Sequence, residues 1–392
     1  MKIDKIIFLV ANTFCERDHD RFGVETLKDN GFEVEIWDLA PIFYPRTFDP
    51  SLSYDCLEHR VFYSKKELLV ALRRSGMGDF MICLIRYDLK SYFIYRAVSA
   101  RRIPYAVWTA NSLPVQRKNR DGLRARSFFK MPTLARVATV ANLLFLNIPF
   151  RFIGIRAATL VFEGGEQPAY SSYPIDPRSE TIRIHSFDYD IYLREKGRRD
   201  AVSKDSMAVF LDEYVPFHPD YMHMGVKPFS EKDDYYPAMR NFFRFVEAKY
   251  KVRVVIAAHP KADYENHPDY FEGRPVVKNR TAELVRDSSL VMAHSSTAIN
   301  FSVLFKKPLI FITTDRLDRS PQKELISVTA ASLGKVAVNI DHFSEDDLED
   351  VLAVDEKAYD NYRNTYIKQD GSVDAPFWQA VSDRLKEGIR YP

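Results

Sequence analysis

The chain has 392 residues, of which 46% are hydrophobic and 28% charged, with a net charge of +2; this is the composition of a globular protein of two ordinary domains, not a disordered or fibrous one. Its three cysteines, Cys15, Cys56 and Cys83, are too few and too widely spaced for a disulfide framework or a zinc motif. The apolar runs 6–11 and 137–150 are too short for a secretory signal and for a bilayer span, which needs ~20 residues, so we expect a cytoplasmic protein.

Alternating strands and helices are predicted from the first residues to about residue 200. Short apolar runs bounded by polar or turn residues indicate strands at 5–10, 33–38, 80–85, 105–109 and 158–162, and helical patterns cover 21–30 and 92–101. Strands separated by helices are typical of a parallel sheet. We therefore expect residues 1–200 to form one Rossmann-like domain.

The alternation restarts after a charged, weakly apolar segment at 188–204, which we interpret as a linker. The second set comprises strands at 208–211, 252–257, 290–292 and 309–313 and helices at 235–250, 281–287 and 298–305. We expect a second Rossmann-like domain over 201–355, and an aromatic helical tail over 356–392 that packs back across the domain junction. The predicted fold class is α/β, with two Rossmann-like domains facing a central cleft, and ligands are expected where strands end.

Basic residues are concentrated in one part of the first domain. Between Leu89 and Phe162 there are thirteen basic residues and one acidic residue, Asp121. Such a segment favours an anionic partner, and its interleaved aliphatic side chains favour a lipid surface over nucleic acid. We expect peripheral contact of residues 117–156 with the inner face of the cell membrane, and no nucleic-acid partner.

His259 follows a predicted strand in the second domain. Pro260 ends that strand and fixes the backbone beside the imidazole, and Lys261 adds a positive charge. A histidine in this position can bind a phosphate, although a plain strand-ending turn has the same residues.

A second motif, Ser295-Ser296-Thr297, follows the next buried strand and His294. Its hydroxyls and the unpaired N–H groups of a helix start suit a phosphate, although serines at a helix start also serve as ordinary N-caps. Because the two motifs follow strands of the same domain, we predict one phosphate-binding site formed by both.

The motifs of the second domain are, in order, His-Pro, Ser-Ser at a helix start, a buried helix, and Lys-Lys-Pro before a strand. This order of motifs resembles the donor domain of bacterial CMP-sugar glycosyltransferases of GT-B fold, which include the sialyltransferases and the transferases of Kdo and other ulosonic acids. The resemblance extends over 205–315, and over 1–200 it rests on the order of elements. It implies a GT-B fold and an inverting transfer of an acidic sugar from CMP to a hydroxyl of a surface glycan. It also implies that His259 assists the departing CMP and that Ser295 and Ser296 bind the phosphate.

The same families carry an acidic motif ending in glycine that supplies the general base. The nearest match is Glu163-Gly164-Gly165-Glu166, which departs from the pattern at Gly164. A base must reach the acceptor hydroxyl by hydrogen bond, and we predict Glu163 for this role. Asp18, after the first strand, is the second candidate.

Asp212 and Glu213 follow the first strand of the second domain and are candidates to bind the ribose or cytosine of the donor. Two Asp-x-Asp strings, 18–20 and 188–190, are compatible with a metal-dependent transferase. A donor with a single phosphate can instead be stabilised by histidine, serine and a helix terminus, so we expect neither metal nor cofactor.

Two alternatives stay open. A CDP-polyol phosphotransferase of the teichoic-acid type also has His-Pro and Ser-Ser elements, but usually an acidic residue before the serines, where this chain has His294. A non-catalytic glycan-binding protein using the basic segment is the alternative from a different functional class.

Overall fold

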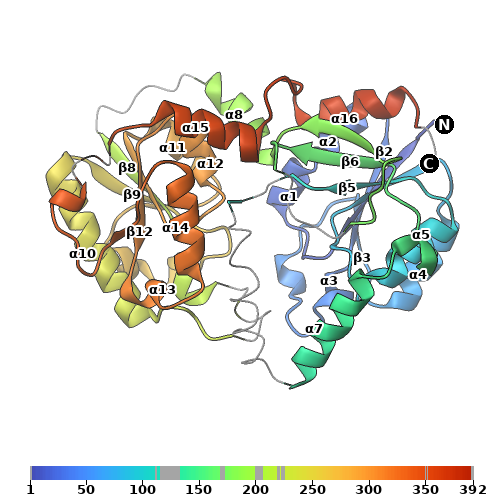
Figure 1. Ribbon diagram of the computed structural model, residues 1–392, viewed down its shortest axis with the longest axis horizontal. Helices are drawn as coiled ribbons and strands as arrows, with labels where there is room; N and C mark the ends of the chain where they lie inside the picture. Colours follow the sequence, from blue (N-terminus) through green and yellow to red (C-terminus); the bar gives the residue numbers. More distant parts are fainter. Residues whose placement is uncertain are drawn as a thin grey trace. The chain divides into compact units, whose positions relative to one another are not determined.

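The computed structural model describes residues 2–110, 113–114, 133–167, 173–198, 206–218, 221, 226–348, 350 and 352–389. The chain divides into two compact units (Figure 1). Unit 1 comprises residues 1–112, 116–185 and 371–392, and unit 2 comprises residues 113–115 and 186–370. We predicted domains over 1–200 and 201–355 with a tail over 356–392. The compact units instead change at 185–186 and 370–371, so the last helices of the chain belong to different units.

Unit 1 is built on seven parallel strands in the order β3-β2-β1-β4-β5-β6-β7. They are β1 (Lys5–Val10), β2 (Glu33–Asp38), β3 (His59–Val61), β4 (Asp79–Cys83), β5 (Tyr105–Trp108), β6 (Leu160–Gly164) and β7 (Glu180–Ile184). The order proceeds outward from β1 in one direction and from β4 in the other. The winding of the chain therefore reverses between β1 and β4, as in a doubly wound Rossmann-like sheet.

The helices described in unit 1 are α1 (Glu16–Arg21), α2 (Val24–Asp29), α3 (Ala40–Phe43), α4 (Lys65–Arg74), α5 (Tyr92–Ala100), α7 (Thr133–Leu146) and α16 (Phe377–Lys386), with 3-10 turns η1 (Pro50–Leu52) and η2 (Phe150–Ile153). The helix expected at 21–30 is present as α2 but begins only at Val24, because Gly23 adopts a left-handed φ of 56° and separates α1 from α2. A Cβ at Gly23 would lie 2.2 Å from Cδ1 of Trp378. The glycine therefore makes room for α16, which lies beside α2 (Figure 1).

Unit 2 contains six parallel strands in the order β10-β9-β8-β11-β12-β13. They are β8 (Met207–Leu211), β9 (Arg253–Ala257), β10 (Val276–Val277), β11 (Leu290–Ala293), β12 (Leu309–Thr313) and β13 (Val338–Asn339). Here the winding reverses between β8 and β11. Two parallel sheets of this kind confirm the prediction of two Rossmann-like α/β domains.

The helices described in unit 2 are α8 (Phe187–Lys196), α10 (Lys232–Tyr250), α11 (Thr281–Asp287), α12 (Ile299–Leu304), α13 (Asp315–Asp318), α14 (Gln322–Ser332) and α15 (Glu356–Tyr362), which continues into the π-helix η7 (Arg363–Ile367). Short 3-10 turns are η3 (Val215–Phe217), η4 (Tyr264–Asn266), η5 (Pro268–Phe271) and η6 (Asp346–Leu348).

The segment predicted as a linker is largely α8. The charged residues of α8 suggest a solvated segment, but two of them contact other elements of the same unit. Asp188 accepts a hydrogen bond from Asn300 at 2.8 Å, and Glu195 pairs with Arg286 at 2.9 Å. The remainder of the predicted linker, 199–204, lies outside the described residues.

Burial follows the position of each strand in its sheet. Every residue of β11 and β12 is buried, as expected for parallel strands covered by helices on both faces. The edge strand β7 has only one buried residue of five, which explains why its sequence carries no apolar run. Pairing with β7 also extends β6 to Gly164, so Glu163 lies within the strand and not after it.

Candidate functional site

The two motifs predicted to bind phosphate lie at the carboxyl ends of neighbouring strands, His259 after β9 and Ser295 after β11, with β8 between them. Since β8 and β11 are adjacent and mark the reversal of winding, this edge is where a doubly wound sheet places its ligand. Asp212 and Glu213 follow β8, His259 follows β9, and Ser295 follows β11. Residues that are up to 83 positions apart in the sequence therefore share one edge of the sheet.

Asp212 links the ends of β8 and β9. Its buried carboxylate accepts hydrogen bonds from the N–H of Tyr214 at 2.9 Å, the N–H of His259 at 3.2 Å and the hydroxyl of Tyr264 at 2.9 Å. Burial raises the pKa of Asp212 to about 6 despite these donors. Because protein donors surround it, Asp212 positions the two loops.

His259 is held in one orientation by its neighbours. Its Nδ1 accepts a hydrogen bond from the N–H of Lys261 at 3.2 Å, so the neutral ring carries its proton on Nε2. The side chain is partly exposed, and the ring of His218 lies 5.0 Å away, centre to centre. Nε2–H is therefore a donor suited to an anionic oxygen. His218 follows Asp212, a predicted ribose or cytosine ligand, by six residues.

Glu213 accepts hydrogen bonds from the serine motif. Its carboxylate accepts hydrogen bonds from the N–H of Ser295 at 2.6 Å and from the Ser295 hydroxyl at 3.3 Å. Desolvation is the largest cause that raises the pKa of Glu213 to about 7, with the charge of Asp212 adding to it. An anionic group thus already binds donors that the sequence assigned to a phosphate.

The rest of the serine motif has more ordinary roles. Ser296 accepts a hydrogen bond from the N–H of Ala298 at 3.2 Å, which is a local turn, and Thr297 and Lys261 are exposed. His294 is fully enclosed between the hydroxyl of Tyr235 and the carbonyl of Ile312, at 2.9 and 2.7 Å. Burial lowers the pKa of His294 to about 4, so it is neutral and structural at physiological pH.

The two candidates for the general base both lie in unit 1. Glu163 is partly exposed near the end of β6, opposite Arg183 of β7. Asp18 lies on α1, where its carboxylate contacts the Cys15 thiol and the Arg17 guanidinium, each at 3.2 Å. They stand on separate elements, and Asp18 already has two partners.

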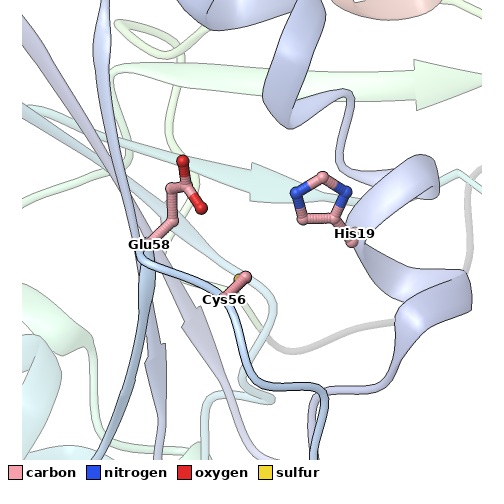
Figure 2. A group of neighbouring side chains, drawn as sticks. All are labelled: His19, Cys56 and Glu58. Atoms are coloured by element: carbon pink, nitrogen blue, oxygen red, sulfur yellow. The ribbon is translucent and has the colours of Figure 1, made fainter.

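A group that spacing along the chain could not reveal is formed by His19, Cys56 and Glu58. One ligand atom from each lies within 4.8 Å of the others (Figure 2). Burial raises the pKa of the Cys56 thiol, and the ion pair with Lys28 is the main cause that lowers the pKa of Glu58.

An apolar surface marks α7. Val137 and Leu144 are 62% and 65% exposed, and Val140 and Leu143 are also exposed, whereas Phe145 packs into the core of unit 1. The apolar face continues past the helix with Ile148 and Phe152, the latter 84% exposed. The basic run 117–132 lies outside the described residues. No helix in the described parts of the chain is long and apolar enough to cross a membrane.

The fold resembles solved structures over its whole length. The wall teichoic acid polymerase TagF has a TM-score of 0.55 at 11% identity, covering 98% of this chain and 89% of that one. CalG4, the calicheamicin glycosyltransferase, gives 0.52 at 12%, covering 99% and 98%. A protein assigned as UDP-N-acetylglucosamine 2-epimerase from Listeria monocytogenes gives 0.51 at 11%, covering 100% and 99%.

At these identities the likeness establishes the architecture, and the GT-B-like fold expected from the sequence is confirmed. The structures carry no argument about the donor that this chain uses. The sequence matches no protein-family model and no curated protein sequence.

Proposed function

We propose that the chain is a metal-independent transferase that binds a cytidine-nucleotide donor at the carboxyl ends of β8, β9 and β11 and releases CMP. The donor is a CMP-activated acidic sugar of the nonulosonic or Kdo type, and the acceptor is a hydroxyl of a surface glycan. One observation carries the proposal: the N–H and hydroxyl of Ser295 hold the carboxylate of Glu213. The same donors suit a phosphate, which presents equivalent anionic oxygens.

The chemistry assigned to His259 follows from its tautomer. The acceptor oxygen forms a bond to the anomeric carbon while the bond from that carbon to the phosphate oxygen of CMP breaks. Negative charge grows on the phosphate, and the Nε2–H of His259 donates a hydrogen bond to it. The acceptor proton passes to a carboxylate, for which Glu163 and then Asp18 stay our predictions.

The carboxylate of Glu213 must leave the N–H and hydroxyl of Ser295 before a phosphate can bind to them. When protonated, it no longer competes as an anion for the donors of Ser295. A carboxyl group with a pKa of about 7 changes its charge near physiological pH, so donor binding and protonation of Glu213 are coupled.

A second candidate is a CDP-polyol phosphotransferase of the teichoic-acid type. The sequence disfavours it, because His294 stands where an acidic residue is usual. Glu213 of the neighbouring strand nevertheless brings an acid to Ser295, which favours this candidate. Both reactions release CMP, but here the polyol phosphate is transferred and the phosphorus–oxygen bond to CMP breaks.

Donor selection tests the proposal. We expect CMP and CDP to raise the melting temperature of the protein more than UDP or GDP, since a ligand of the native state stabilises it. Turnover with a CMP-ulosonate and with CDP-glycerol, followed by mass analysis of the acceptor, separates transfer of a sugar from transfer of a phosphate. Stabilisation by UDP or GDP alone would overturn the cytidine assignment.

Metal independence is tested in the same assay. Transfer is expected to keep its rate in EDTA, because histidine and serine donors stabilise the single phosphate of the donor. Activity that is lost in EDTA and restored by Mg²⁺ or Mn²⁺ would contradict this.

We also propose that unit 1 rests on an anionic membrane, where a lipid-linked glycan acceptor resides. The apolar face of α7 supplies buried area in the interface, and the basic stretch 117–156 supplies positive charge that attracts lipid phosphates. Each fully inserted aliphatic side chain contributes ~1.5–3 kcal/mol.

A further inference from the structure

His19, Cys56 and Glu58 come together from two separate parts of unit 1. His19 lies on α1, and Cys56 and Glu58 lie in the segment that leads into β3. Figure 2 shows the imidazole and the carboxylate facing one another, with Cys56 between them. The side chains of His19 and Glu58 are only 16% and 12% exposed, and Cys56 is partly buried.

The three side chains are the three ligand types that zinc prefers: imidazole nitrogen, thiolate sulfur and carboxylate oxygen. A tetrahedral zinc ion with bonds of ~2.0–2.3 Å keeps its ligand atoms ~3.3–3.8 Å apart. The atoms here lie within 4.8 Å of one another, so side-chain movements of about 1 Å close the site. One thiolate and one carboxylate also neutralise the charge of a divalent ion.

We propose that His19, Cys56 and Glu58 bind one Zn²⁺ ion, with water as the fourth ligand, and that the metal fastens α1 to the segment before β3. The helix has six residues, none of them buried, and no side-chain N-cap. His19 packs against the rings of Tyr54 at 5.5 Å and Phe14 at 6.5 Å, and its ring nitrogens lie 3.9 Å from carboxylate oxygens of Asp20 and Glu25. A metal bond adds a directional link between the two segments.

Lys28 completes the surroundings of the site. Its ammonium donates to Oε1 of Glu58 at 2.8 Å, which orients the carboxylate and leaves the metal to bind through Oε2. Such outer partners orient the groups that bind metals, and their loss typically weakens binding ~10–100-fold. The zinc site uses no residue of the proposed donor site. Because α1 also carries Asp18, the second candidate for the general base, occupancy is measured by metal binding and not by turnover.

Co²⁺ is the probe, because it replaces Zn²⁺ in tetrahedral sites and reports thiolate ligation by an absorption band. We expect the full-length protein to bind one Co²⁺ per chain, with a thiolate-to-cobalt band that Zn²⁺ displaces. Cys56→Ser should abolish the band, and His19→Ala and Glu58→Gln should each weaken binding by ~100-fold or more, beyond the loss of an outer partner. Cys15→Ser, a second partly exposed thiol in the same unit, should keep the band.

Folding of each variant is checked by circular dichroism in the absence of metal. As an independent readout, Zn²⁺ should raise the melting temperature of the wild type and of Cys15→Ser, but not that of Cys56→Ser. Absence of stoichiometric Co²⁺ binding by the wild type would overturn the proposal. So would a thiolate band that survives Cys56→Ser, or one that Cys15→Ser abolishes.

Discussion

The two units use acidic side chains at their strand ends differently. In unit 1, the wholly buried Asp38 at the end of β2 accepts hydrogen bonds from the N–H groups of Phe14, in the loop after β1, and of Ala40, the first residue of α3. Asp212 does the same after β8 of unit 2. Unit 2 adds a second, partly exposed acid, Glu213, on the N–H of Ser295.

Asp38 and Asp212 have a structural role, whereas Glu213 lies where a ligand can bind. A carboxylate enclosed by backbone donors fixes a loop, and each unit has one. A carboxylate whose donors can also bind another anion, such as a phosphate, marks a candidate ligand site. Among the described residues at these two sheet edges, Glu213 beside β11 is such a carboxylate. The donor site that we propose therefore lies in unit 2, whereas the proposed membrane contact and the proposed zinc site lie in unit 1.

The largest expected effect is that of His259→Ala. We expect turnover to fall by about 10³-fold, since the variant loses the donor that meets the charge on CMP. His267→Ala, an exposed histidine of the same unit, should retain full activity. Near-normal turnover by well-folded His259→Ala would remove the assignment of catalysis to this edge of unit 2.

The second-largest effect is expected from loss of the general base in unit 1. Glu163→Gln removes basicity with little change of volume, and loss of a general base should lower turnover by about 10² or more, with a weaker effect on donor affinity. Asp18→Asn is the matched comparison, expected to be milder because Asp18 already binds Cys15 and Arg17. If Glu163→Gln keeps more than about a tenth of wild-type turnover, Glu163 is not the base.

Substitutions on the two units should differ by more than tenfold in their effect on partition into anionic vesicles. The double variant Val140→Glu, Leu144→Glu places two charges on the exposed face of α7, so its partition into vesicles containing anionic lipid should fall by more than tenfold. Val336→Glu, an exposed aliphatic of unit 2, is the control and should bind like the wild type. Equal partition of both variants in a sedimentation assay would exclude the α7 face.

The smallest effect concerns pH. Below the pKa of about 7, Glu213 is protonated, and above it the carboxylate competes with the phosphate for Ser295. Affinity for a CMP-sugar, whose phosphodiester keeps one charge, should therefore fall about tenfold between pH 6 and pH 8. Calorimetric titration of Glu213→Gln should give a flat profile, and an unchanged slope would mean that another group controls binding.

Much of the fold follows from local sequence. The ranges of β1, β2, α11 and β12 agree with the predicted ones, because each is an apolar or amphipathic run with polar ends. The strand β7 was missed because an edge strand needs no buried face, and the break at Gly23 depends on Trp378, 355 residues away.

The site was predictable by residue type and only partly by role. His259 and Ser295 were found because Pro260 and the serine run are local signals. The bond between Glu213 and Ser295 joins residues 82 apart and depends on β8 lying next to β11. His19 and Cys56 are likewise 37 residues apart, so no spacing rule for zinc motifs includes them.

The return of α16 to unit 1 bears on how the chain is made. The ring of Phe377 lies 4.5 Å from that of Trp108 and 5.6 Å from that of Phe162, centre to centre, and the ring of Trp378 lies 5.2 Å from that of Phe8 of β1. A ribosome synthesises these rings only after all of unit 2. The strands translated first must therefore wait for the residues translated last, and during that time Phe8, Trp108 and Phe162 lack their cover, a state in which chaperones bind nascent chains.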